Sequence, residues 1–268
     1  MNKICTMAQA IESIPDGAMV AIGGNTLNRV PMEAVYQMAR QNKRNLQLVK
    51  TAGAMDIDLL CLAGCVKSVD AGYVSYESQF SLCRYYRQAV EKGQVITYEH
   101  ACYTVICALR AAAYGIPFMP VKGLGQTQLM ESNPRLGHIQ DPFGGPDIAV
   151  VQAIRPNFAI LHVHYADQAG NAMICGPVYE DLLMVQASER VIITTEEIVP
   201  DNYFRRQDVK AQIPAFQVEA VVHAPKGARP TAMPFCYPVD EAEVRAFQGL
   251  GAAEQLSKYL EGRREAAR

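Results

Sequence analysis

Short apolar runs alternate with amphipathic segments along the whole chain. The runs are rich in Val, Ile and Ala, as in strands that are buried on both faces of a parallel sheet. The segments between them carry apolar residues at helical spacing. The pattern predicts an α/β fold, with a mostly parallel sheet flanked by helices on both faces. The expected strands are residues 19–22, 46–51, 68–74, 95–98, 118–121, 158–163, 191–195 and 218–223. The expected helices are residues 6–14, 31–41, 58–63, 78–92, 99–114, 180–188, 240–247 and 252–265.

A chain of 268 residues has room for one large domain or two small ones. The Gly- and Pro-rich stretch 133–146 lacks the Ser/Gly monotony of a linker, so we expect an ordered excursion there and not a boundary. We find no internal repeat. The sequence therefore predicts a single domain over residues 1–268, with a helical C-terminal tail over about 240–268.

Composition excludes several classes of protein. The net charge is −2, which implies no broad basic surface for nucleic acid. No apolar stretch is long enough to span a bilayer, and the N-terminus does not resemble a signal peptide. We expect a cytoplasmic protein whose eight cysteines are mostly small buried hydrophobic residues, since neither a disulfide framework nor a zinc set is indicated.

The segment from Asp16 to Pro31 is the most informative part of the chain. It predicts a turn, a buried strand, the glycine pair Gly23–Gly24, and a helix that begins at the proline. Glycines allow a sharp turn and a close approach to a ligand, and free N–H groups near a helix start suit an anion or a developing oxyanion. Neither the dinucleotide-binding nor the P-loop motif is present. The loop is expected to be an active-site wall, with a tight turn that binds no ligand as the alternative.

Glu99 directly follows the expected strand 95–98, at the predicted start of a helix. There it is either an acid that the helix dipole stabilises or a general base at the mouth of a site. The adjacent His100 could titrate near neutral pH, but neighbouring residues on a helix point in different directions.

A glycine-containing loop follows the expected strand 118–121. Gly125 and Gln126 in this loop are candidate substrate contacts, with an ordinary turn as the alternative. Arg29 and Lys122 are the nearest cations for a substrate carboxylate. Arginine suits this bidentate role better, and a solvated charge is the simpler reading of Lys122.

Other polar clusters indicate structure more than chemistry. His162 and His164 share one face of a strand and could begin a metal site with Asp167. The Gly-Asn that follows Asp167 favours a turn instead, so no metal is expected. We expect Glu196–Glu197 to be mainly structural. Ser75 has no visible base and lies in no nucleophile elbow, which argues against a serine hydrolase.

In combination, these segments resemble the alpha (A) subunit of family I coenzyme A transferases. The resemblance runs from about residue 14 to residue 229. It depends on the glycine loop at 23–24, the segment around Pro117, Ala166–Asp167 with Gly170–Asn171, and the segment 196–199. The family usually has Phe where this chain has Asn25, and Gly where it has Arg29. The form with 29–32 as Arg-Val-Pro-Met is similar to the glutaconate CoA-transferase branch.

The resemblance implies a CoA-transferase architecture, no bound cofactor, and a coenzyme A thioester as substrate with a carboxylic acid as acceptor. It also implies a beta subunit that carries the catalytic glutamate, in a heterotetramer with two copies of each subunit. The backbone near Gly23, Gly24 and Asn25 would then hold the oxyanion. Arg29, Gln126 and Glu99 would orient the acyl chain, and Gly125 would touch it.

Two other readings stay open within this resemblance. The chain could belong to a CoA-ester hydrolase of the same superfamily, which opens a ring or cleaves a C–C bond with Glu99 as the base. It could also be a non-catalytic scaffold whose only role is to stabilise a partner. A sugar-phosphate isomerase of similar architecture would need a clearer phosphate-binding cluster than the sequence contains.

Overall fold

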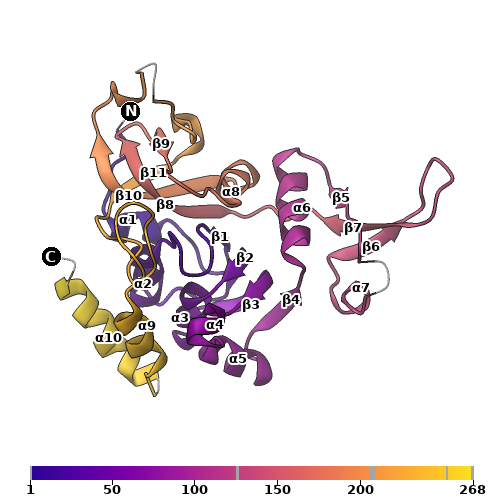
Figure 1. The fold of residues 1–268 in the computed structure, drawn as a ribbon, viewed down its shortest axis with the longest axis horizontal. Coiled ribbons are helices and arrows are strands. Elements are labelled where there is room, and N and C mark those ends of the chain that lie inside the picture. Colours follow the sequence, from indigo (N-terminus) through magenta and orange to yellow (C-terminus); the bar gives the residue numbers. More distant parts are fainter. Residues whose placement is uncertain (1, 125–126, 206–208, 252, 267–268) are drawn as a thin grey trace.

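A computed structural model describes residues 2–124, 127–205, 209–251 and 253–266 (Figure 1). Its main sheet has the strand order β11-β10-β8-β1-β2-β3-β4, and the short β9 pairs with β8. Every pair along that order is parallel, which confirms the predicted α/β fold. The strands are β1 (Met19–Ile22), β2 (Leu46–Gly53), β3 (Val66–Val74), β4 (Ile96–Glu99), β8 (Phe158–Asp167), β9 (Ala172–Met173), β10 (Arg190–Val199) and β11 (Ala220–His223).

The direction of strand addition reverses between β1 and β8. The chain first adds β2, β3 and β4 on one side of β1, then returns to place β8 on its other side and continues to β10 and β11. Val20 of β1 is accordingly paired with Leu48 on one side and with Phe158 on the other. Ligands of open parallel sheets bind beyond the carboxyl ends of the strands at such a reversal, so this edge is the first place to look for a site.

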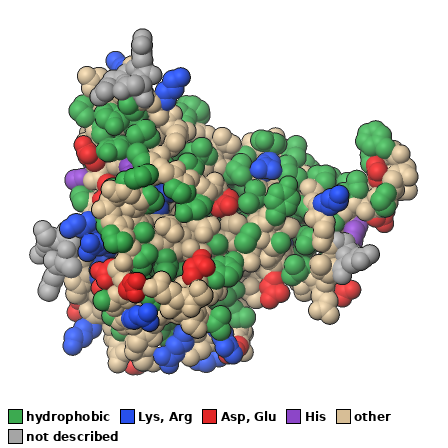
Figure 2. Space-filling model, viewed as in Figure 1, with side chains coloured by type: hydrophobic (Ala, Val, Ile, Leu, Met, Phe, Trp, Pro, Cys, Tyr) green, Lys and Arg blue, Asp and Glu red, His purple; other side chains and the backbone are tan. Residues whose placement is uncertain are grey.

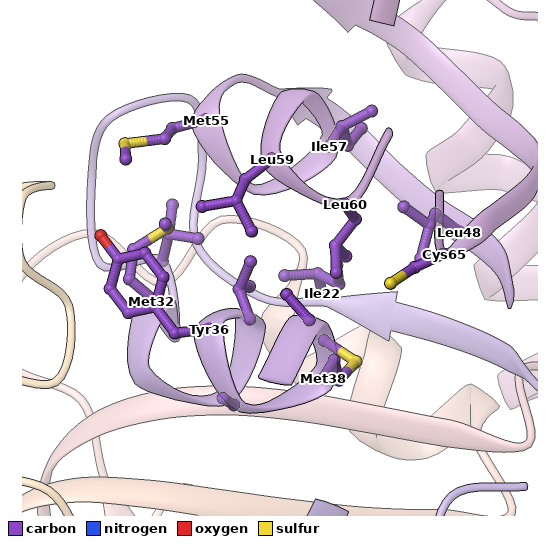
Figure 3. Close-up of a cluster of buried hydrophobic side chains, with 14 of the residues drawn as sticks. Ile22, Met32, Tyr36, Met38, Leu48, Met55, Ile57, Leu59, Leu60 and Cys65 are labelled. Atoms are coloured by element: carbon purple, nitrogen blue, oxygen red, sulfur yellow. The ribbon is translucent and has the colours of Figure 1, made fainter. Parts of the chain in front are cut away.

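Helices cover both faces of the main sheet. On one face, α2 (Met32–Arg40) and α3 (Met55–Leu62) pack against alternate strand residues such as Ile22 and Leu48, as Figure 3 shows. On the other face, α6 (Cys102–Ala113) and α8 (Asp181–Ala187) pack against residues such as Val49. The remaining helical segments are α1 (Met7–Glu12), α4 (Glu77–Phe80), α5 (Arg84–Glu91), α9 (Glu241–Gln248), α10 (Ala253–Ala266), η1 (Tyr203–Arg205) and η2 (Ala215–Gln217).

An arm extends from the body beyond α6, and the space-filling view shows it projecting from the surface (Figures 1 and 2). It contains an antiparallel sheet with the order β5-β7-β6 and the short helix α7 (Leu129–Ser132). Its strands are β5 (Phe118–Pro120), β6 (Leu136–Ile139) and β7 (Ile148–Gln152). The expected strand 118–121 therefore exists but belongs to this second sheet. The expected excursion 133–146 contains β6, and β6 and β7 were not predicted from the sequence.

Charged contacts anchor the arm to the edge of the main sheet. Asp70 on β3 is fully buried, and Arg135 donates to it with Nε at 2.5 Å and Nη2 at 3.1 Å. The ring of His100 lies 3.2 Å from the same carboxylate, Nε2 to Oδ1. Asn133 donates to the carbonyl oxygen of Glu99 at 2.7 Å. The arm is thus tied to β3 and β4 close to their carboxyl ends.

The structure corrects the reading of two predicted helices. The expected helix 78–92 is divided into α4 and α5, with Ser81 between them at a positive φ of 69°. Glu99 does not open a helix, because it is still paired with Ala71 as the last residue of β4, and α6 begins only at Cys102. The reading of Glu99 as a carboxylate stabilised by a helix dipole is therefore wrong.

The cysteines agree only in part with the expectation that most of them are buried. All eight cysteines are free; four of them are buried, whereas Cys102 and Cys236 are exposed. None of the helices in the described part of the chain is long and apolar enough to cross a bilayer.

Asp58 shows how a buried carboxylate shapes the body of the protein. Its Oδ1 accepts the N–H groups of Tyr85 at 2.7 Å and Tyr86 at 2.8 Å, in the first turn of α5, and its Oδ2 accepts the hydroxyl of Tyr76 at 2.9 Å. Burial raises the pKa of Asp58 to about 6, although these hydrogen bonds oppose the rise. Asp58 therefore binds its proton more tightly in the folded protein than in the unfolded chain.

The expected consequence is a pH-dependent loss of stability that Asp58→Asn removes. The stabilisation from this raised pKa is complete below the ordinary value of 3.8 and is lost as the pH rises through about 6. The loss amounts to about 3 kcal/mol. Chemical unfolding of the wild type and the variant between pH 4 and pH 7 measures it. Asp147→Asn, at an exposed site, is the matched control. Equal slopes for wild type and Asp58→Asn would contradict the assignment.

Candidate active site

Two loops meet at the carboxyl edge where the strand order reverses. One follows β1, from Gly23 to Arg29, and the other leads into α8, from Gly176 to Asp181. The carboxylate of Asp181 joins them: Oδ1 accepts the N–H of Gly24 at 3.0 Å, and Oδ2 accepts Nη1 of Arg29 at 2.5 Å. Both side chains of this ion pair are fully buried.

The glycine loop directs its N–H groups inward, to acceptors of the protein itself. Gly23 donates to the carbonyl of Ile160 at 2.9 Å, Gly24 to Asp181, and Asn25 to the carbonyl of Asn28 at 2.9 Å. None of these three groups is free for a thioester oxygen. The expected oxyanion role of Gly23, Gly24 and Asn25 is therefore wrong in this structure, because the loop satisfies its own donors.

Close packing explains why glycines occupy these positions. Gly24 has a φ of +73°, and a Cβ there would lie 2.4 Å from the carbonyl oxygen of Asn28. A Cβ on Gly23 would lie 3.1 Å from Cγ of Leu161. The pair lets the chain turn tightly against Ile160 and Leu161 of β8, which accounts for both glycines by packing alone.

Arg29 is also engaged inside the protein. Its Nη1 donates to the carbonyl of His162 at 3.0 Å as well as to Asp181, and its Nη2 donates to the carbonyl of Pro177 at 3.1 Å. Its guanidinium carbon lies 5.8 Å from the centre of the Tyr179 ring. The expectation that Arg29 meets a substrate carboxylate is contradicted, because this side chain is fully buried and holds the two loops together.

A second buried ion pair supports the glycine loop from the neighbouring strand β2. Nζ of Lys50 lies 2.6 Å from Oδ2 of Asp56 and 3.1 Å from the carbonyl oxygen of Gly23. Sequence reasoning missed this pair. A lysine in the middle of a largely apolar strand, six residues before an aspartate, was the available signal.

Glu99 lies elsewhere on the same edge. It is exposed at the end of β4 and borders a hollow of about 240 Å³ that Val74, Leu82 and Tyr86 also line. Strands β2 and β3 separate it from β1. At the usual spacing of strands, that is a separation of roughly 14 Å. The structure therefore does not bring Glu99 next to the glycine loop.

The loop after β5 borders another hollow. Lys122 and Gly123 line it together with Tyr103, Asp147 and Ile148, and its volume is about 570 Å³. The hollow lies where the arm meets the start of α6. The candidate contacts Gly125 and Gln126 fall outside the described residues.

The two strand histidines form structural bonds. Nδ1 of His162 lies 2.8 Å from Oγ1 of Thr194, and Nε2 of His164 donates to the carbonyl of Pro234 at 2.8 Å. Asp167 accepts the N–H groups of the next turn, as predicted, with that of Gly170 at 2.9 Å. Within the described ranges, no group of three His, Cys, Asp or Glu residues could hold a metal ion.

Glu196, on β10, connects β8 to the loop before α9 through its hydrogen bonds. Its Oε1 lies 2.9 Å from Nε2 of His162 and accepts the hydroxyl of Tyr237 at 2.5 Å, while Oε2 accepts the N–H of Lys226 at 2.7 Å. Burial alone would raise the pKa of Glu196, but these hydrogen bonds outweigh burial and lower it. This saturated geometry agrees with the structural role that we expected of Glu196.

Sequence comparison places the chain among known proteins. The Coenzyme A transferase family model matches residues 4–224. The A subunit of 3-oxoadipate CoA-transferase from Pseudomonas knackmussii is 28% identical over 99% of this chain and 96% of its own length. The cholesterol ring-cleaving hydrolase IpdA subunit of Mycobacterium tuberculosis is 29% identical, over 97% and 94%. An uncharacterised protein of Archaeoglobus fulgidus is 35% identical over 97% of this chain, which spans only 60% of that protein.

Solved structures agree with this placement. The glutaconate coenzyme A-transferase of Acidaminococcus fermentans superposes with a TM-score of 0.91 at 27% identity, over 97% of this chain and 88% of the other. A variant of the AibA/AibB decarboxylase superposes with a TM-score of 0.87 at 33% identity, over 98% of both chains. The chain therefore belongs to the family I coenzyme A transferases as an alpha (A) subunit, related to those of glutaconate and 3-oxoadipate CoA-transferases.

Proposed function

We propose that this chain is the A subunit of a heteromeric enzyme that moves coenzyme A between an acyl-CoA and a carboxylic or dicarboxylic acid. The observation that carries the proposal is its match, over nearly the whole length of both chains, to the A subunit of a CoA-transferase. The partner B subunit's glutamate attacks the thioester carbonyl, and the C–S bond breaks to release CoA thiolate. The thiolate then attacks the glutamyl carbonyl of the resulting anhydride, and the anhydride C–O bond breaks to release the donor acyl group as a free carboxylate. This leaves a glutamyl-CoA thioester, which passes CoA to the acceptor carboxylate.

The local geometry is compatible with a shared active site. The buried ion pairs of Arg29 and Lys50 fix the floor of the carboxyl edge. Ser75, the serine just after β3, donates its hydroxyl to the carbonyl of Ser81 at 3.0 Å and is thus used structurally. In this proposal the A subunit supplies a preformed wall, and the nucleophile belongs to the partner.

A second candidate function has its own support. Glu99 is exposed beside a hollow of about 240 Å³, as a base acting on water would be. The IpdA subunit, which is a relative of similar length, belongs by name to a ring-cleaving hydrolase. In this alternative the enzyme hydrolyses a ring or a C–C bond of a CoA ester, and Glu99 takes the proton of the attacking water.

The first prediction concerns the complex of this chain with its B subunit. When the two are co-purified and given a dicarboxyl-CoA ester with a labelled carboxylic acid, we expect CoA to move onto the labelled acid. Free thiol is expected to stay low, because CoA remains bound as a glutamyl thioester between the two half-reactions. Chromatography of the labelled acyl-CoA and a thiol assay measure both products. Ester consumption without label in the CoA pool would contradict transfer, and a complex that binds no acyl-CoA would indicate a scaffold.

The second prediction separates transfer from hydrolysis through Glu99→Gln. If the complex transfers CoA, kcat/KM is expected to change by less than about 3-fold, since no step of transfer needs this base. If Glu99 activates water, the loss is expected to be about 10²- to 10⁴-fold. Glu91→Gln, which alters another carboxylate of the same hollow, is the matched control.

The third prediction tests the role of Arg29 as the link between the two loops. Arg29→Met leaves the Asp181 carboxylate buried without its cation, so the free energy of unfolding is expected to fall by about 3–5 kcal/mol. Thermal or chemical unfolding measures the loss. Arg87→Ala removes an exposed ion pair and is expected to change stability little. A fully stable Arg29→Met variant with a raised KM would instead favour substrate binding.

A further inference from the structure

Phe235 is an aromatic residue that lies almost wholly in solvent beside the candidate active site. It is 87% exposed and lies in a tight turn between Met233 and Tyr237, which form an isolated antiparallel bridge. The backbone closes this turn at both ends: the N–H of Met233 donates to the carbonyl of Tyr237 at 2.9 Å, and the N–H of Tyr237 donates back at 3.0 Å. The turn 233–237 therefore presents a phenyl ring at the surface.

The backbone of Phe235 has a conformation that bulky residues rarely adopt. Its φ is +65°, in the left-handed region that favours glycine and asparagine. Tyr179, in the loop that leads into α8, likewise has a positive φ of 53° and is 39% exposed. Residues held in such conformations carry a local energetic cost, and they cluster at functional sites. Two exposed rings held in this way indicate a role beyond the packing of the chain itself.

Hydrogen bonds hold the turn 233–237 firmly to the body of the protein. The hydroxyl of Tyr237 donates to Glu196 at 2.5 Å. The ring of His164 joins two segments, because its Nδ1 accepts the N–H of Cys175 at 3.0 Å and its Nε2 donates to the carbonyl of Pro234 at 2.8 Å. Burial lowers the pKa of His164, in keeping with the neutral ring that these two bonds require. The turn is therefore preorganised, and a partner that binds it loses little conformational entropy.

The turn 233–237 also packs against the second loop of the carboxyl edge. A Cβ on Gly176 would lie 3.2 Å from Cε2 of Phe235 and 3.3 Å from Cβ of Pro234. Gly176 begins the loop that ends at Asp181, the ion-pair partner of Arg29. Phe235 therefore lies at the same edge of the sheet as the candidate active site.

The surface around the two rings is uncharged. Neither segment 176–179 nor segment 234–238 contains Asp, Glu, Lys or Arg. The cores of protein–protein interfaces are depleted of charged residues and enriched in Tyr and Phe. The exposed residues of the two segments have this composition, and we call them the aromatic patch: Gly176, Pro177, Tyr179, Phe235, Cys236 and Pro238.

The proposed function identifies the partner that covers this patch. In the proposed reaction the B subunit has to bring its glutamate to the carboxyl edge, and the aromatic patch lies on that edge. The floor of the edge offers a partner few polar groups, because Gly24, Arg29 and Asp181 are hydrogen-bonded to one another. Contact with the B subunit there has to come largely from apolar surface, and an exposed ring suits an apolar pocket in the partner.

We propose that the aromatic patch is the docking surface for the B subunit, and that the ring of Phe235 is its anchor in an apolar pocket of that subunit. This inference rests on the proposed function for the identity of the partner. It adds where on the A subunit the partner binds and which side chain contributes most to the contact.

The experiment measures how tightly the A and B subunits stay together. The co-purified complex is diluted stepwise, and mass photometry gives the fraction that is still assembled. Phe235→Asn is expected to raise Kd at least about 30-fold, because an anchor ring is lost. Asparagine tolerates a positive φ, so the turn is kept. Phe235→Tyr retains the ring and is expected to retain the affinity.

The matched control is Tyr114→Asn, which removes an exposed ring at the C-cap of α6, outside the aromatic patch. It is expected to change Kd by less than about 3-fold. Thermal unfolding checks that each variant folds.

The possible outcomes separate the inference from the proposed function. An unchanged Kd for Phe235→Asn would overturn the inference, even if the KM for acyl-CoA rose, since the ring would then contact the ligand. A dimer of this chain alone that Phe235→Asn dissociates would assign the patch to a second copy and would also overturn it. A wild-type complex that assembles but moves no CoA would contradict only the proposed function. A chain that forms no complex with the B subunit would contradict both.

Discussion

The buried ion pair between Arg29 and Asp181 is the interaction on which the carboxyl edge depends. The two side chains come from loops that are 152 residues apart in sequence, and both are fully removed from solvent. Isolated burial would cost each charge several kcal/mol, and the carbonyl groups that accept from Arg29 and the Gly24 amide that donates to Asp181 offset this cost, although Nε of Arg29 has no hydrogen-bond partner within the described residues. The pair therefore fixes β1, β8 and α8 in one arrangement.

At the carboxyl ends of the strands, this arrangement separates a buried layer of ion pairs, the floor, from the exposed polar side chains around it, the rim. The glycine loop, Arg29 and Lys50 form the floor, and they are hydrogen-bonded within the protein, apart from Nε of Arg29. Glu99, on the rim, keeps its carboxylate accessible. Chemistry in this half of the site therefore depends on the rim, whereas changes to the floor act through stability.

The sequence was a good guide to the sheet and a poor one to the site. Strands such as 19–22 and 158–163 were predicted because uninterrupted Val, Ile and Ala runs identify buried parallel strands. Strand β6, with a glycine and a histidine among its four residues, lacks that pattern, and its partner β7 was overlooked. The family resemblance added a thioester substrate and a partner subunit, which no local pattern of residues contains.

The site was misread for a different reason. The glycine pair was correctly recognised as a tight turn at a strand end, but the use of its N–H groups depends on Asp181, a residue 157 positions away from Gly24. Likewise, an arginine beside a predicted loop looks like a ligand for a carboxylate until its buried partner is known. Local sequence predicts which backbone shapes are possible, whereas long-range contacts decide which donors remain free.

The arm illustrates how a charge can make an extension indispensable. Asp70 belongs to the main sheet and has no exposure of its own, yet its cation Arg135 is supplied by the arm. Without the arm, the buried Asp70 carboxylate would lose Arg135 and would keep the imidazole ring of His100 as its side-chain partner. A chain shortened past residue 135 would therefore need a compensating change at position 70.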